Sequence, residues 1–128
     1  MTIERRHLTT DRTPANMSQG VKAGNIVAVS GQVPLGPDGQ LVGAGDIGAQ
    51  AEQCFANIAA VLGQVGAGLG DIVKLTAFLL NPTDLPRYLE VRGATFTKEP
   101  PASTTVVAAG ILVPGGLIEI EALAVVDQ

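Results

Sequence analysis

Residues 45–79 read "GDIGAQAEQCFANIAAVLGQVGAGLGDIVKLTAFL", and they predict an amphipathic helix followed directly by a buried strand. In the first half of this stretch apolar residues recur at steps of three and four, which is the spacing of one helical face. They are Ile47, Ala51, Cys54, Phe55, Ile58, Leu62 and Val65. Asp46 suits the N-cap, and Gly66 and Gly68 suit the stop. Residues 71–80 predict the strand, whose apolar face carries Val73, Leu75, Ala77 and Leu79.

The flanking segments predict more strands and a second helix. The expected strands are residues 2–9, 24–34, 103–109 and 117–126, and the second helix is 85–96, with Leu85, Tyr88, Leu89 and Phe96 on its inner side. This order contains two strand-helix-strand units, whose crossovers place both helices on one face of a single sheet. A chain of 128 residues is long enough to bury its own core. We therefore expect one α+β domain over residues 1–128.

The opposite face of this sheet is expected to be too apolar for water. We assign to it Ile72, Lys74, Thr76, Phe78, Leu80, Ser103, Thr105, Val107, Leu117, Glu119, Glu121, Leu123 and Val125. An apolar face with carboxylates and hydroxyls set into it suits a contact between subunits. The pattern predicts a homo-oligomer with polar pockets where its subunits meet.

Composition excludes several classes of protein. The net charge of −4 is unfavourable for binding phosphate backbones, so nucleic acid is not expected as a partner. No apolar run approaches the roughly 20 residues that cross a bilayer, and the N-terminus has no apolar leader. The single cysteine permits no internal disulfide, and no Cys/His spacing matches a metal site. We expect a cytoplasmic protein without a metal or a membrane partner.

Three features of the sequence could indicate a cofactor site or a catalytic residue, but each has a simpler structural interpretation. Residues 43–48, "GAGDIG", match a dinucleotide-binding pattern, yet a hairpin signal precedes them and no acidic residue ends the next strand. Glycines that serve a turn and a close helix contact explain them better. His7 is expected to be a solvated surface residue, not a catalytic base. Cys54 lies in the helix stripe, where a small buried apolar residue is the usual meaning.

Arg92 and Glu119 each leave two interpretations open. Arg92 falls on the inner stripe of the second helix, where it either extends to water or directs its guanidinium at an anionic ligand or a neighbouring subunit's carboxylate. Glu119 and Glu121 share one strand face with apolar neighbours. A carboxylate there is either paired across the subunit contact with Lys74 or an arginine, or has a raised pKa suited to proton transfer.

Taken together, the motifs resemble the Rid/YjgF family of reactive-intermediate deaminases. The resemblance is carried by "SGQVP" at 30–34, by residues 45–79, by "PPAS" at 100–103 and by "LIEIEALAVV" at 117–126. It implies a chorismate-mutase-like fold, with about six strands in a mixed sheet and both helices on one face. It also implies a homotrimer with pockets between subunits. Family members of the best-known kind hydrolyse enamines and imines such as 2-aminoacrylate to 2-keto acids and ammonia, without cofactor or metal.

Some positions of this chain have the residue that the family uses in its pocket, and others have a different one. Gly31 and Glu119 match the family's backbone contact and its proton- or water-handling glutamate. Ser103 stands where the family has the arginine that holds the substrate carboxylate. The remaining lining positions are Thr105, Met17 and Leu89. This implies a pocket that is more apolar and uncharged at its base, suited to a larger or less anionic imine, enamine or carbonyl compound. The alternative is a non-catalytic trimer that binds a metabolite or a partner protein.

Overall fold

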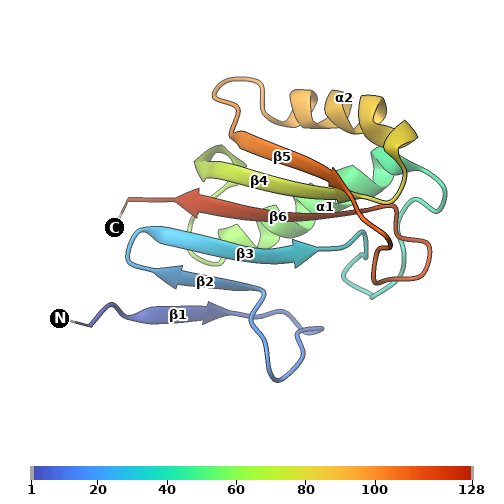
Figure 1. Cartoon of the computed structure of the whole chain (residues 1–128). Coiled ribbons are helices and arrows are strands. Elements are labelled where there is room, and N and C mark those ends of the chain that lie inside the picture. Colours follow the sequence, from blue (N-terminus) through green and yellow to red (C-terminus); the bar gives the residue numbers. More distant parts are fainter. Residues whose placement is uncertain (1, 128) are drawn as a thin grey trace.

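A computed structural model describes residues 2–127, and Figure 1 shows its mixed six-stranded sheet. The strands are β1 (Arg5–Leu8), β2 (Gly20–Ala23), β3 (Ile26–Gln32), β4 (Ile72–Leu79), β5 (Ala102–Val107) and β6 (Ile118–Val125). The helices are α1 (Ile47–Gly63) and α2 (Leu85–Thr95), with short 3-10 turns at Leu69–Asp71 and Pro82–Asp84. The strand order is β1-β2-β3-β6-β4-β5. The α+β architecture expected from the sequence is confirmed.

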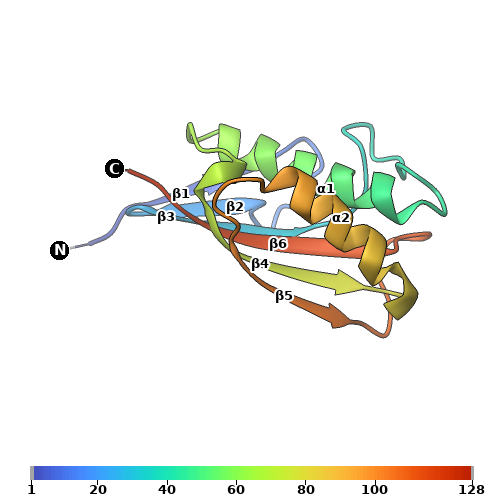
Figure 2. The ribbon, with the colours of Figure 1, turned by 90° about the horizontal axis from the view of Figure 1, so that it is seen from above.

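Both helices cover the same face of the sheet, as Figure 2 shows. Strand β4 is parallel to β5, which follows it through α2, while every other neighbouring pair is antiparallel. The last strand, β6, lies between β3 and β4. Residues far apart in the chain are thereby adjacent at the centre of the sheet. Strand β5 is left at one edge, without a partner on its outer side.

The core lies between the sheet and α1. Ala51, Cys54, Ile58 and Leu62 of α1 are completely buried, as the apolar stripe predicts. The carboxylate of Asp46 accepts a hydrogen bond from the backbone N–H of Ala49 at 3.1 Å, so Asp46 is the N-cap of α1. Burial of this stripe holds α1 against β3 and β6, the strands that carry Gly31 and Glu119.

Strand β4 begins on the opposite face from the one its alternation predicts. Val73 was expected on the buried face, but it is 45% exposed, while Ile72 is 4% exposed. The register between β4 and β6 shifts between Ile72 and Lys74, which reverses the alternation there. From Leu75 to Leu79 the strand follows the predicted pattern.

The faces of β5 are also reversed relative to the prediction. Ser103 pairs with Leu75 and Thr105 with Ala77, and both of these partners are buried under the helices. Paired residues on adjacent strands point to the same face. Ser103 and Thr105 therefore face the helical layer, not the open face of Glu119. Alternation shows which residues share a face, but only the pairing with β4 shows which face that is.

The inner side of α2 is narrower than the sequence suggests. Its buried residues are Tyr88 and Val91, whereas Leu85 and Leu89 are each 38% exposed. Phe96, just past the helix end, packs partly buried against the core. The predicted inner position of Leu85 and Leu89 is therefore wrong, because α2 presents only one narrow stripe to α1 and the sheet.

Candidate functional site

The carboxylate of Glu119 lies against the backbone of Gly31. Glu119 points to the open face of the sheet from β6, and Gly31 lies where the pairing of β3 with β6 is irregular. A Cβ added to Gly31 would overlap the carboxylate, coming within 2.9 Å of its Cδ atom. Only glycine leaves room for the glutamate in this position.

The pKa of Glu119 is raised, first by partial burial and second by the negative charge of Glu121. Lys74 does not neutralise either carboxylate, since its Nζ donates to Thr104 Oγ1 at 2.6 Å and to the carbonyl of Leu75 at 3.2 Å. Among residues 2–127, the one salt bridge joins Arg87 to Glu90. Glu119 therefore forms no salt bridge within residues 2–127, and both its pairing across a subunit contact and its proton-transfer role stay predictions.

A second polar cluster lies at the junction of α2 and β5. The Nη1 atom of Arg92 donates to Ser103 Oγ at 3.1 Å, and the guanidinium carbon lies 5.8 Å from the centre of the Tyr88 ring. Arg92 and Ser103 border an open depression of about 450 Å³. Its lining residues are Leu89, Arg92, Gly93, Phe96, Pro100, Pro101 and Ser103. The pocket base was expected to be uncharged, but a guanidinium lies directly on Ser103.

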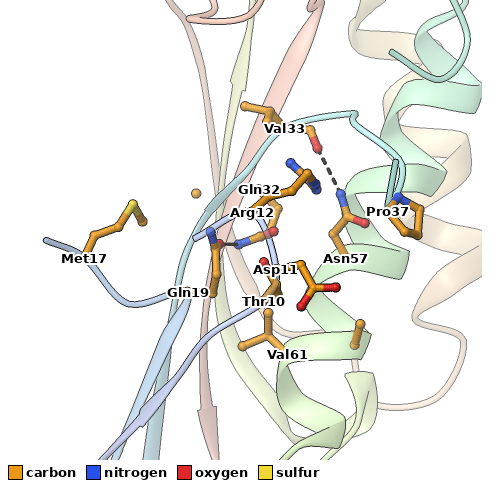
Figure 3. A pocket seen from close by; sticks show the side chains of 12 residues that line it. Thr10, Asp11, Arg12, Met17, Gln19, Gln32, Val33, Pro37, Asn57 and Val61 are labelled. Atoms are coloured by element: carbon orange, nitrogen blue, oxygen red, sulfur yellow. Dashed lines mark hydrogen bonds between the residues drawn. The ribbon is translucent and has the colours of Figure 1, made fainter. Parts of the chain in front are cut away.

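Met17 and Gly31 border a different cavity, of about 330 Å³, between the loop after β1, the end of β3 and α1. Figure 3 shows that Met17 lies apart from the polar side chains beside α1. Asn57 of α1 donates to the backbone carbonyls of Val33 at 3.0 Å and Leu35 at 2.9 Å. Asn57 thereby anchors the segment that follows β3, while Met17 stays 42% exposed.

The predicted site residues therefore form two groups in a single chain. The first group, Gly31 and Glu119, meets at the open face of the sheet, and Met17 lies near Gly31. The second group, Leu89, Arg92 and Ser103, lies on the helix-covered side at the β5 edge. Thr105 follows Ser103 on that side of β5. One chain does not bring the two groups together, because the sheet lies between them.

His7, Cys54 and the glycines of residues 43–48 are arranged as expected for residues without a catalytic or cofactor-binding role. His7 is exposed, and its Nδ1 lies 2.9 Å from Ser18 Oγ. Cys54 is completely buried, and burial, followed by the charge of Glu119, raises its pKa far above the usual range. Gly43 and Gly45 have positive φ values of 76° and 72°, so the loop before α1 uses them as turn residues. Gly48 makes close contact with Arg87 of α2.

Two buried polar groups of the core, the Gln50 amide and the Tyr88 hydroxyl, were not predicted from the sequence. Gln50 is completely buried, and its amide donates to the carbonyls of Gly43 and Gly115 and accepts from the N–H of Leu117 at 2.7 Å. It fixes the loop that leads into β6. Gln50 comes three residues after Ile47 and so lies on the predicted buried face of the helix, and this spacing could have indicated its burial. The hydroxyl of Tyr88 is buried and has no hydrogen-bond partner among residues 2–127, which no sequence pattern indicates.

Two kinds of site are not formed by the described residues. Between residues 2 and 127, no three His, Cys, Asp or Glu side chains are grouped so as to hold a metal ion. In the same part of the chain, every helix is too short or too polar to cross a membrane.

Comparison with known proteins identifies the family. The family model described as Endoribonuclease L-PSP matches residues 10–126. The 2-iminobutanoate/2-iminopropanoate deaminase of Escherichia coli (strain K12) is 37% identical in an alignment of 125 residues that covers 92% of this chain and 95% of that protein. Protein DfrA of Myxococcus xanthus is 39% identical over 112 residues, or 88% of this chain and 85% of that protein.

Solved structures share the fold closely. The crystal structure of yeast Mmf1 superimposes with a TM-score of 0.90 at 31% identity, and the match covers 97% of this chain and 100% of that one. The similarity extends over the sheet and both helices. The chain therefore belongs to the Rid/YjgF family, as its motifs indicate.

Proposed function

We propose that this protein hydrolyses a reactive enamine or imine to a carbonyl compound and ammonia. The observation that carries the proposal is the Glu119 carboxylate, which lies on Gly31 with a raised pKa and no cationic partner in the described chain. A raised pKa makes it easier for a carboxyl group to hold a proton and then give it up during a reaction. The deaminase name of the Escherichia coli relative supports the same reaction class.

The reaction consumes one water molecule, and two protons are gained and two are lost along the way. An enamine is first protonated on carbon, which gives the protonated imine. Water then adds to the imine carbon and loses one proton, the nitrogen gains one, and ammonia leaves as the C=O bond forms and the hydroxyl loses its proton. Glu119 supplies and recovers these protons. A protonated imine is electrophilic by itself, so the proposal includes no metal or cofactor, and exhaustive chelation should leave the rate unchanged.

We further propose that the working unit is a homotrimer, which is typical of the family. The two groups of site residues lie on opposite sides of one sheet, so the Glu119 group of one subunit would meet the Ser103 group of the next. Exposed apolar residues on the open face support a subunit contact there, among them Ile26, Leu123 and Val125. Small-molecule ligands would bind in the pockets between subunits, and we place this trimer in the cytosol.

We propose that 2-aminoacrylate is a poor substrate. Ser103 replaces the strand arginine of the archetype, and charge-assisted hydrogen bonds contribute roughly 1.5 to 3 kcal/mol each, so a small substrate that needs a cation on β5 should bind weakly. The exposed apolar side chains of Leu89 and Met17 would favour substrates with a larger apolar group. An imine derived from a branched or sulfur-containing amino acid has this character.

The test is ammonia release from imines generated in the cuvette by an amino-acid oxidase. Glu119→Gln should lower the rate by roughly 10²- to 10⁴-fold, the usual contribution of a general acid-base group. Glu52→Gln is the matched control, because Glu52 is exposed on α1. If Glu119→Gln equals the unchanged protein on every imine, the proposed reaction is wrong.

The alternative is a non-catalytic trimer that binds a metabolite or a partner protein in the same pockets. It is favoured by the apolar side chains of Met17 and Leu89 at lining positions. Ligand binding that persists in Glu119→Gln, with no turnover by the unchanged protein, would support it. We do not propose RNA cleavage, because the net charge is −4 and the only histidine, His7, is on an N-terminal strand.

A further inference from the structure

Arg92 is a guanidinium held in place without a carboxylate partner. It makes no salt bridge to any residue from 2 to 127. A neutral hydroxyl, Ser103 Oγ, accepts one of its hydrogen bonds, and the Tyr88 ring supports it from below at 5.8 Å. An arginine has five N–H donors, and Ser103 accepts from only one of its nitrogens. The others are available to the depression that Arg92 lines.

Contacts with neighbouring side chains fix the orientation of the Arg92 guanidinium, whereas a side chain that simply extended into water would not be fixed. The contact with Ser103 connects α2 to the edge strand β5 across eleven residues of sequence. Tyr88 is itself fixed, since it is fully buried and its ring stacks on Phe55, 6.4 Å between centres. Its orphan hydroxyl lies beside Arg92 and Ser103. A planar fork fixed on an aromatic face is well suited to bind a carboxylate through two parallel hydrogen bonds.

We infer that Arg92 binds the carboxylate of the substrate and determines specificity for carboxylate-bearing imines, with Ser103 and Tyr88 as its positioning residues. The inference deepens the proposed function and rests on it. The cation reaches the pocket from α2 and not from β5. The substrate is then a 2-imino acid, and its apolar side chain contacts Leu89, which borders the same depression.

The geometry also makes positions 92 and 103 mutually exclusive for arginine. A second guanidinium at position 103 would lie against the first, and two cations in contact repel each other. Ser103 is short and neutral, so it accepts a hydrogen bond and leaves space for Arg92. We therefore expect Ser103→Arg alone to weaken carboxylate binding, whereas the same change combined with Arg92→Ser should restore it.

The experiment measures binding of a stable product pair, so that it does not depend on turnover. The probes are 4-methyl-2-oxopentanoate, which carries a carboxylate, and 4-methyl-2-pentanone, which does not. Calorimetry should show that Arg92→Gln weakens keto-acid binding by roughly 10- to 100-fold, as expected for lost charge-assisted hydrogen bonds, and leaves ketone binding unchanged. Arg87→Gln, on the same helix but paired with Glu90, should change neither affinity.

Three further readouts complete the test. Arg92→Lys keeps the charge but loses the fork, so its keto-acid affinity should fall between those of Gln and Arg. The swap Arg92→Ser with Ser103→Arg should recover keto-acid affinity, which a merely structural arginine would not permit. Sedimentation should show the same assembly for Arg92→Gln and the unchanged protein. Dissociation would mean that Arg92 pairs with a carboxylate of a second copy.

The inference is overturned if Arg92→Gln binds the keto acid as well as the unchanged protein, if it loses ketone binding in parallel, or if the assembly dissociates. Each result is separable from failure of the proposed function. Arg92-dependent binding without turnover of any imine would refute the deaminase proposal alone. Turnover that is insensitive to Arg92 would refute only the inference.

Discussion

The carboxylate of Glu119 occupies the space that a side chain at position 31 would need. The two residues come from β6 and β3, which are neighbours in the sheet although they are far apart in the chain. The contact leaves the glutamate beside a backbone that offers no charge, so partial burial raises its pKa without compensation. Glycine at position 31 is thus part of the chemistry of Glu119.

Gly31→Ala should displace the carboxylate, because the added methyl group would overlap it. We expect the rate of imine hydrolysis to fall at least tenfold, a fraction of what general acid-base groups contribute. Gly63→Ala is the matched control. Gly63 is an exposed residue at the end of α1 where an added Cβ meets nothing within 4 Å. It should retain full activity. Equal activity in both variants would show that the position of Glu119 is unimportant.

Glu121→Gln should move the pH profile to lower pH. The charge of Glu121 is the second cause of the raised pKa of Glu119, after burial. Removing that charge lowers the pKa of Glu119 toward its ordinary value but leaves the effect of burial. The limb of the kcat/KM profile that reports Glu119 should shift down in pH, whether Glu119 acts as acid or base. An unmoved limb would mean that another group titrates there.

Leu123→Arg should break the subunit contact. Leu123 is 36% exposed on the open face, and a buried unpaired cation there would be costly. We expect smaller particles by analytical ultracentrifugation and loss of activity, with an unchanged circular dichroism spectrum. Leu85→Arg is the control, because Leu85 is 38% exposed but lies on the helical layer. An intact trimer in Leu123→Arg would exclude the open face as the interface.

Gln50→Leu should destabilise the fold although leucine fits an apolar core. The change leaves the carbonyls of Gly43 and Gly115 and the N–H of Leu117 without their partner. Each orphaned buried group costs about 1 to 3 kcal/mol, so we expect a loss of about 2 kcal/mol or more in urea unfolding. Protein concentration must be held constant, since assembly contributes to stability.

The exposed Gln64→Leu is the control for this measurement. Gln64 donates one side-chain hydrogen bond, to the carbonyl of Thr9 at 3.0 Å. Its change should stay within about 0.5 kcal/mol, as for most surface substitutions. If Gln50→Leu unfolds at the same urea concentration as this control, the hydrogen bonds of Gln50 do not hold the loop before β6.

Local patterns predicted the elements well because each pattern is set by nearby residues. The stripe of α1 and its cap at Asp46 appear where the sequence indicates, and β3 lies within the strand expected at residues 24–34. Strand β2 was not identified, since it has only four residues and begins with glycine. The reversal at Val73 was not predictable either, because a register shift depends on the partner strand and not on the strand itself.

The sequence by itself determined the α+β class, the family and the order of the elements other than β2, and the family resemblance singled out Glu119 and Gly31 as candidate site residues. Tertiary structure decided which way the side chains of β5 face, and hence that Ser103 meets Arg92 and not Glu119. Alternation along a strand shows which side chains share a face but not which of the two faces is covered by the helices. Only the register between β4 and β5 decides this. The charge beside Ser103 comes from a helix eleven residues earlier in the chain, a contact that exists only once α2 has packed against the sheet.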